Sequence, residues 1–178
     1  GASIIDADVL SREAVAQGRF RTEIAPVAVP QRKGEPVVID TDEAPSKGDP
    51  SKFAALRPVF DKAGSVTAAN ASTLNDGASA VVLVSAESGR AQGLTPLARI
   101  VAHASFAQAP EWFTTAPVGA VNAALAKAGL GVGDIDLFEI NEAFAVVALA
   151  CNAGLGLDAA KVNVNGGAIA LGHPIGSS

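Results

Sequence analysis

The chain has 178 residues, and 49% of them are hydrophobic, which is enough for one packed domain or slightly more. Aromatic residues make up only 4%, whereas alanine occurs 37 times and glycine 18 times, so we expect a core of small, closely packed side chains. The net charge of −5 and the pI near 4.9 argue against a nucleic-acid-binding protein, because phosphate binding needs a concentrated positive face. One cysteine and two histidines exclude an internal disulfide and a zinc cluster, so no metal or cofactor is expected.

Both ends of the sequence suggest a piece of a longer protein. There is no methionine, and the last residues lie in a glycine-rich loop whose serine pair, 177–178, would cap a helix that does not follow. No run of apolar residues approaches the ~18–20 that a membrane span needs, and no secretory signal opens the chain. We therefore expect no membrane span and a reducing, cytoplasmic location.

The first 64 residues are expected to be irregular and peripheral. They contain a short helix over 11–17 with Ser11 as its cap, a loose strand over 20–29, and a turn-dense surface stretch over 30–50. A second unit, 65–95, begins with small polar residues and continues into an apolar run of strand length over 78–84.

Residues 96–178 alternate strand and helix and form the third predicted unit. The helices are delimited by Pro117 in a first turn and by Gly129 just past an end, and the second helix is apolar almost all round, which indicates burial on every side. The elements expected in order are a strand over 97–104, a helix over 117–128, a strand over 134–140, a helix over 142–153 and a strand over 162–165. This order predicts a layered α/β architecture.

Polar residues concentrate where the strand over 134–140 meets the apolar helix. Asn141 lies at this junction, a place where open α/β sheets present ligands. Asparagine is also a preferred helix cap, so Asn141 is either a functional group or the N-cap of the helix.

A second concentration is the glycine loop over 165–176. Its glycines permit positive φ and close approach by a ligand, and Pro174 restricts His173 to extended conformations, so the imidazole is suited to act as a base. A purely structural loop histidine is the alternative. His173 and Pro174 stand where a phosphate-binding P-loop has Lys and Ser/Thr, and no G-x-G-x-x-G follows a strand, so nucleotide sites of both kinds are rejected.

The remaining histidine and the cysteine are interpreted as structural. His103 lies in a predicted strand, and Cys151 lies on the apolar helix, where a buried thiol behaves as a small apolar group.

Three segments together resemble the thiolase family, that is, acetyl-CoA acetyltransferases and 3-ketoacyl-CoA thiolases. The segments are N-E-A-F-A over 141–145, N-V-N-G-G-A-I-A-L-G-H-P-I-G-S over 163–177, and the N-A-S-x-L-N-D-G core over 70–77. Their order is that of the family, and the resemblance covers essentially the whole chain. It implies the αβαβα layered fold in the intact enzyme, incomplete here, with 1–64 as part of the loop domain, 65–95 as the end of the first core half and 96–178 as a truncated second half.

The resemblance implies a Claisen-type acyl transfer between coenzyme A thioesters. In the family the G-H-P histidine activates a nucleophilic cysteine and, with a water held by the N-E-A-F asparagine, forms an oxyanion hole, and these roles map onto His173 and Asn141. Ser72 would contact the pantetheine arm of coenzyme A, whose channel would be lined by Ala68, Leu74, Ala143 and Phe144. A homo-oligomer, dimer or tetramer, is also implied, as is a place in fatty acid metabolism.

The sequence departs from the family in its cysteines. The family's nucleophilic cysteine belongs before residue 1 and the second cysteine after residue 178, and Cys151 matches neither motif. The basic residues that thiolases use around the adenine and phosphates are not recognisable in 43–48, so no phosphate contact is assigned. Two alternatives stay open: a thiolase-like module that binds CoA thioesters without catalysis, and a structural subunit.

Overall fold

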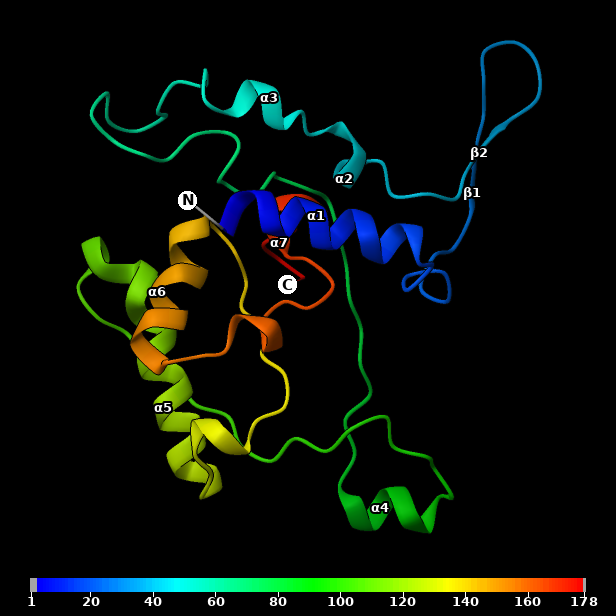
Figure 1. The fold of residues 1–178 in the computed structure, drawn as a ribbon. Helices are drawn as coiled ribbons and strands as arrows, with labels where there is room; N and C mark the ends of the chain where they lie inside the picture. Colours follow the sequence, from blue (N-terminus) through cyan, green and yellow to red (C-terminus); the bar gives the residue numbers. More distant parts are fainter. Residues whose placement is uncertain (1–2, 178) are drawn as a thin grey trace.

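The structure is a computed structural model that describes residues 3–177. A long helix, α1 (Ser3–Ala16), lies at the centre, and the short C-terminal helix α7 (Ala168–Leu171) packs beside it (Figure 1). The other elements are β1 (Val27–Val29), β2 (Val37–Ile39), α2 (Ala44–Lys47), α3 (Pro50–Phe53), α4 (Ala86–Ala91), η1 (Pro110–Thr115), α5 (Ala116–Ala128), η2 (Val132–Asp134), α6 (Ala145–Leu155) and η3 (Ala159–Lys161). The division of the chain at residues 64 and 95 stays a prediction.

Helix α1 begins earlier than the sequence pattern indicated, so the prediction of Ser11 as its cap is wrong. Ser11 lies inside the helix and is fully buried, because the backbone of Gly166 approaches it closely. A Cβ built on Gly166 would lie within 2.8 Å of the Ser11 Cβ. Glycine at 166, with φ at 92°, therefore lets the loop before α7 rest on α1.

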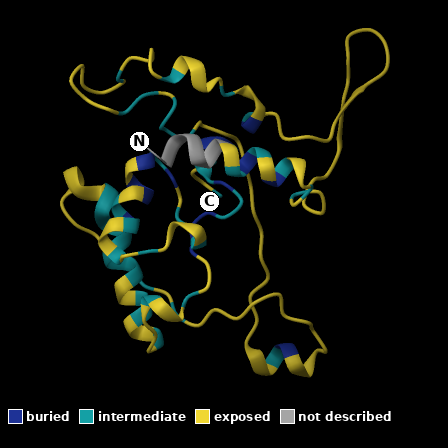
Figure 2. Cartoon of the chain, in the orientation of Figure 1, coloured by how far each residue is buried: buried dark blue, intermediate teal, exposed yellow. Residues whose placement is uncertain are grey.

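The peripheral part contains a hairpin that the sequence analysis recognised only in part. β1 and β2 pair antiparallel, with Val27 opposite Ile39 and Val29 opposite Val37. The predicted strand over 20–29 is thus confirmed only at its end, and the stretch 30–50, predicted as turns, supplies the second strand. The hairpin projects from the molecule with its valines exposed (Figures 1 and 2).

Helices α5 and α6 pack against each other and form a helical layer, which contacts α1 through α6. α5 has the predicted bounds within one residue and ends at Gly129 in the left-handed conformation, φ 70°. Its Val118 packs against Gly154 of α6, where a Cβ would meet a Val118 methyl at 3.0 Å. Glycine at 154 therefore allows the two helices to approach closely.

Helix α6 is buried on one side, whereas the sequence predicted burial all round. Its buried residues include Val147, Ala148 and Cys151, but Val146 and Leu149 are 45% and 48% exposed. The helix connects Phe138 to Val162, which pair in parallel, with the Asn163 N–H donating to the Phe138 carbonyl at 2.9 Å. The sequence predicted a β-α-β unit here, and the structure contains it as a single parallel bridge in place of two full strands.

The predicted strands over 78–84 and 97–104 are extended but pair with no other strand among the described residues. Their apolar side chains lie in solvent: Val82 is 88% exposed and Leu97 fully exposed. Figure 2 shows the two segments as long exposed arms that lead to and from α4. A strand is stable only when its backbone groups are paired, so these arms lack the neighbours that would make them a sheet.

No helix within residues 3–177 is both long enough and apolar enough to cross a membrane.

Candidate functional site

The three sequence motifs meet at one place in the structure. Residues 70–74 run between the N-E-A-F segment and the glycine loop, with Ala71 pairing antiparallel to Phe144 and Leu74 pairing parallel to His173. The Ala145 N–H donates to the Asn70 carbonyl at 2.9 Å, and the His173 N–H donates to the Thr73 carbonyl at 3.1 Å. Segments up to a hundred residues apart in the sequence are thereby fixed side by side.

Asn141 and His173 lie within hydrogen-bonding distance of each other. Asn141 Nδ2 is 3.3 Å from His173 Nε2, so the amide donates to this ring nitrogen whenever the nitrogen carries no proton. Asn141 is exposed and His173 is half-buried. The arrangement leaves a polar pair that a ligand can reach.

The alternative in which Asn141 caps a helix is wrong. α6 begins at Ala145 and its N-cap is Phe144, three residues beyond Asn141. The first free N–H of the helix is satisfied by the Asn70 carbonyl from another segment, so the helix needs no asparagine cap at 141.

Ser72 and Ala143 are in direct contact. The Ser72 N–H and its Oγ both donate to the Ala143 carbonyl, at 3.1 and 3.2 Å. Leu74 is 86% exposed beside His173, and Ala68 is exposed in the turn before Asn70. Four of the five residues predicted to bind substrate thus belong to segments that pair directly at this place, and Ala68 lies next to them in sequence.

An aromatic cluster surrounds Phe144. The rings of Phe60 and Phe113 meet the Phe144 ring edge to face, with centroids 5.8 and 6.2 Å away. Phe60 and Phe113 are 73% and 52% exposed, so they form an open apolar wall. Sequence reasoning missed both, because their segments are far from the motifs.

Two glycines let the motif segments touch. A Cβ on Gly77 would come within 2.6 Å of Pro174, and one on Gly172 within 2.5 Å of the Asn75 Cγ. Gly172 also has φ at 93°, which other residues rarely adopt. These glycines fix how closely residues 75–77 approach the His173 loop.

Glu142 and Asn163 were also missed as site residues. They are 6% and 5% exposed, and Asn163 Nδ2 donates to Glu142 Oε1 at 3.2 Å. A carboxylate at the start of the apolar stretch 143–151 was the available signal for Glu142, since charged side chains are rarely buried without partners.

The structure confirms the interpretation of Cys151 as a buried structural thiol, but not that of His103 as a histidine held in a strand, because residues 97–104 pair with no strand among the described residues. Cys151 is fully buried, and burial raises the pKa of its thiol. His103 is exposed, and its carbonyl accepts a hydrogen bond from Lys127 Nζ at 3.1 Å. Within the described residues no group of three or more His, Cys, Asp and Glu side chains is arranged to hold a metal ion.

Comparison with known proteins points to one family. The profile described as "Thiolase, N-terminal domain" matches residues 5–87, and that described as "Thiolase, C-terminal domain" matches residues 94–178. Acetyl-CoA acetyltransferases of Pseudomonas aeruginosa and Yarrowia lipolytica are 57% and 54% identical over 166 and 168 residues, or 93% and 94% of this chain and 42% of each relative.

Solved structures that resemble this chain are thiolases as well. A thiolase from Ascaris suum in complex with coenzyme A superimposes with a TM-score of 0.91 at 44% identity, covering 99% of this chain and 45% of that one. Human mitochondrial 3-ketoacyl-CoA thiolase gives 0.88 at 42% identity, covering 98% and 44%. The chain thus spans less than half the length of these relatives. Its fold is the corresponding part of the layered α/β thiolase fold, and the chain belongs to the thiolase family.

Proposed function

We propose that this chain is part of an acyltransferase of the thiolase type, which makes or cleaves carbon–carbon bonds between CoA thioesters such as acetyl-CoA and 3-ketoacyl-CoA. We call the full-length protein that would contain it the complete enzyme. The observation that carries the proposal is the 3.3 Å approach of Asn141 Nδ2 to His173 Nε2 at the meeting point of three thiolase motifs.

In this proposal His173 is the base that takes the proton of a nucleophilic cysteine contributed by the rest of the enzyme. Its loop position between Gly172 and Pro174, with the backbone N–H bonded to Thr73, holds the imidazole stiffly. Once protonated, the ring is a donor, and Asn141 supplies a second donor directly or through a water. Two preorganised donors suit the oxygen of a thioester as negative charge develops on it.

Ser72, Ala68, Leu74, Ala143 and Phe144 are proposed to bind the pantetheine arm. Small side chains beside the Phe144 cluster leave room for a thin chain, and the apolar rings offer a surface along which it can lie. The Ser72 hydroxyl already donates to Ala143, so it is oriented with its lone pairs available to a pantetheine amide.

We also propose that the complete enzyme is a cytoplasmic homo-oligomer that acts in fatty acid metabolism. Family resemblance supports this, and sedimentation of the complete enzyme measures the oligomeric state.

The decisive experiment is an assay of the purified complete enzyme with acetoacetyl-CoA and CoA. We expect formation of acetyl-CoA, and a His173→Ala variant that is slower by several orders of magnitude. Titration with CoA in a calorimeter runs in parallel. Binding without turnover would favour a non-catalytic CoA-thioester-binding module, and neither binding nor turnover would favour a structural subunit.

A further inference from the structure

A single buried amide holds the backbone just before Asn141. The Ile140 N–H donates to Asn163 Oδ1 at 2.7 Å, and Asn163 Nδ2 donates back to the Ile140 carbonyl at 2.9 Å. The same Nδ2 gives its other hydrogen to Glu142 Oε1 at 3.2 Å. The Asn163 side chain is therefore hydrogen-bonded to Ile140 and Glu142, the residues on both sides of Asn141.

Asn163 adopts a backbone conformation that other side chains avoid. Its φ of 47° makes it the one non-glycine residue with positive φ among residues 3–177. Asparagine is one of the few non-glycine residues that adopt this left-handed conformation readily. Here it aims the amide at the segment that carries Asn141 and turns the chain into the glycine loop, where the Gly166 N–H donates to the Asn163 carbonyl at 2.8 Å.

Glu142 connects this amide to the loop of His173. While Oε1 accepts from Asn163, Oε2 accepts from the Ile169 N–H in α7 at 3.3 Å. The carboxylate fills the space beside Gly167, where a Cβ would lie within 2.5 Å of the Glu142 Cδ. Helix α7 ends two residues before His173, so Glu142 spans the distance between the two site segments.

We propose that Glu142 and Asn163 are positioning residues that set the separation of Asn141 and His173 and thereby the rate of the chemical step. The inference rests on the proposed function and deepens it, because it names groups that act through Asn141 without touching substrate. If Glu142 and Asn163 only stabilised the fold, their substitution would have the same effect whether or not Asn141 is present.

A double-mutant cycle in the complete enzyme tests the proposal. Glu142→Gln keeps the shape but replaces an acceptor oxygen with a donor, so the side chain can no longer accept from both Asn163 and Ile169. We expect kcat to fall by about 10- to 100-fold, as for a small misplacement of a catalytic group, with KM for the CoA thioester changed less than about threefold. In the Asn141→Ala background the same change should lower kcat by less than about threefold.

The second variant separates the amide from the backbone conformation. Asn163→Gly accepts positive φ but removes the amide, and it should show the same loss of kcat and the same dependence on Asn141. The matched control for Glu142→Gln is Glu139→Gln, which changes an exposed carboxylate on the same segment. The matched control for Asn163→Gly is Asn165→Gly, because the Asn165 Oδ1 accepts from Arg19 at 3.1 Å and, among the described residues, is not hydrogen-bonded to the segment of Asn141. Both controls should keep kcat within about twofold of the parent.

Equal losses with and without Asn141, or an unchanged kcat in both variants, would overturn the proposal. So would the loss of the folded state in both variants, because the pair would then serve the fold as a whole.

A crystal structure of the Glu142→Gln complete enzyme separates this proposal from the proposed function. We expect the Asn141 Nδ2 to His173 Nε2 distance to exceed the hydrogen-bond limit of about 3.5 Å. If the unsubstituted enzyme has no thiolase activity, the proposed function fails while this distance still tests the positioning role. An unchanged distance would overturn that role.

Discussion

At the scale of single residues, the site combines two exposed polar groups with a buried polar support. Asn141 and His173 face solvent in part, whereas Glu142 and Asn163 lie below them, nearly inaccessible. Buried polar groups are costly unless they are hydrogen-bonded, and these two satisfy each other and the neighbouring backbone. The exposed pair is therefore available to a ligand, whereas the buried pair holds the backbone around it.

Substitution of His173 and Asn141 in the complete enzyme should have unequal effects. His173→Ala removes a base and an oxyanion donor together, so we expect kcat to fall by several orders of magnitude. Asn141→Ala should lower kcat by about 10²-fold, since water can partly replace its amide. Steady-state kinetics of both variants measures the difference, and equal effects would contradict this division of roles.

Thermal melts of the same variants provide the control. Because Asn141 is exposed and caps no helix, Asn141→Ala should change the free energy of unfolding by no more than about 0.5 kcal/mol. A lowered melting temperature with unchanged kcat would support a structural role for Asn141 instead.

Cys151 should react slowly with iodoacetamide in the folded complete enzyme. Burial blocks access and raises the pKa of the thiol, which reduces the reactive thiolate. We expect the native rate to be lower than the rate in denaturing urea by at least about 100-fold, measured by mass mapping. Early modification of Cys151 under native conditions would show that α6 does not shield it.

The same pKa shift has a defined effect on stability. The folded-state pKa lies above the unfolded value, so the advantage of the neutral thiol is complete below the unfolded pKa and is lost as the pH rises through the folded pKa. Cys151→Ala should therefore weaken the alkaline decline in stability, which urea titrations across that range would detect.

At the scale of elements, glycines decide how closely the motif segments approach. Gly77 faces Pro174, Gly167 faces Glu142 and Gly172 faces Asn75, each at a place where a Cβ would collide. The segments pair through a few backbone hydrogen bonds rather than through a long sheet, so small steric changes act on the site directly.

Gly77→Ala should destabilise the complete enzyme and disturb its site. The new Cβ would come within 2.6 Å of Pro174, so the loop of His173 must shift, and overpacking of this kind costs about 1–3 kcal/mol. Gly176→Ala is the matched control in the same loop, because open space surrounds that position and its φ is not positive. Urea unfolding and kcat of both variants are the measurements, and equal stabilities would contradict the close packing seen here.

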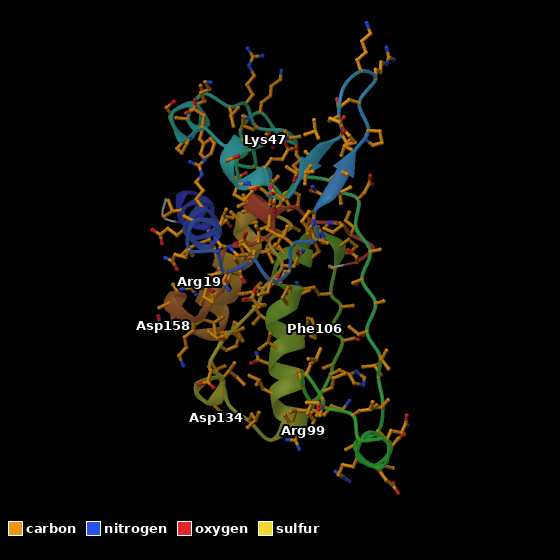
Figure 3. The ribbon with its side chains drawn as sticks, turned by 90° about the vertical axis from the view of Figure 1, so that its right-hand side faces the viewer. Arg19, Lys47, Arg99, Phe106, Asp134 and Asp158 are labelled. Atoms are coloured by element: carbon orange, nitrogen blue, oxygen red, sulfur yellow. The ribbon has the colours of Figure 1, made fainter. Side chains whose placement is uncertain are left out.

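Close packing at α5 illustrates the same point away from the site. The ring of Phe106 lies over Gly119, where a Cβ would meet it at 2.6 Å, and Figure 3 shows Phe106 beside the helix. The extended segment that leads to η1 is thereby attached to the helical layer. The apolar residues nearer α4 have no comparable support among the described residues.

At the scale of the whole molecule, the buried core is small and the exposed apolar surface is large. The buried apolar residues are mostly alanines and valines around α6 and α7, whereas large side chains of the two arms are exposed (Figure 2). The exposed large apolar residues of the arms include Val81, Val82, Leu83 and Leu97. The arms have the extended form of strands and pair with no strand among the described residues.

The isolated 178-residue chain should have no detectable thiolysis of acetoacetyl-CoA. Its one cysteine is fully buried and cannot act as the nucleophile. We also expect strong binding of a hydrophobic dye and a broad thermal transition, because the arms are unpaired. Turnover above that of a His173→Ala control, or a sharp transition without dye binding, would contradict these expectations.

The sequence by itself determined the family, the helix over 117–128 with its proline and glycine limits, and the three motifs that meet at the site. These features depend on local signals: periodicity, caps and contiguous motifs. Only the tertiary structure decided that Asn141 caps no helix, that Ser11 is buried and that Glu142 and Asn163 support the site. Each of these outcomes depends on a partner distant in sequence, such as Asn70 for α6 or Gly166 for Ser11, and local pattern carries no information about which distant segment will supply a hydrogen bond or fill a space.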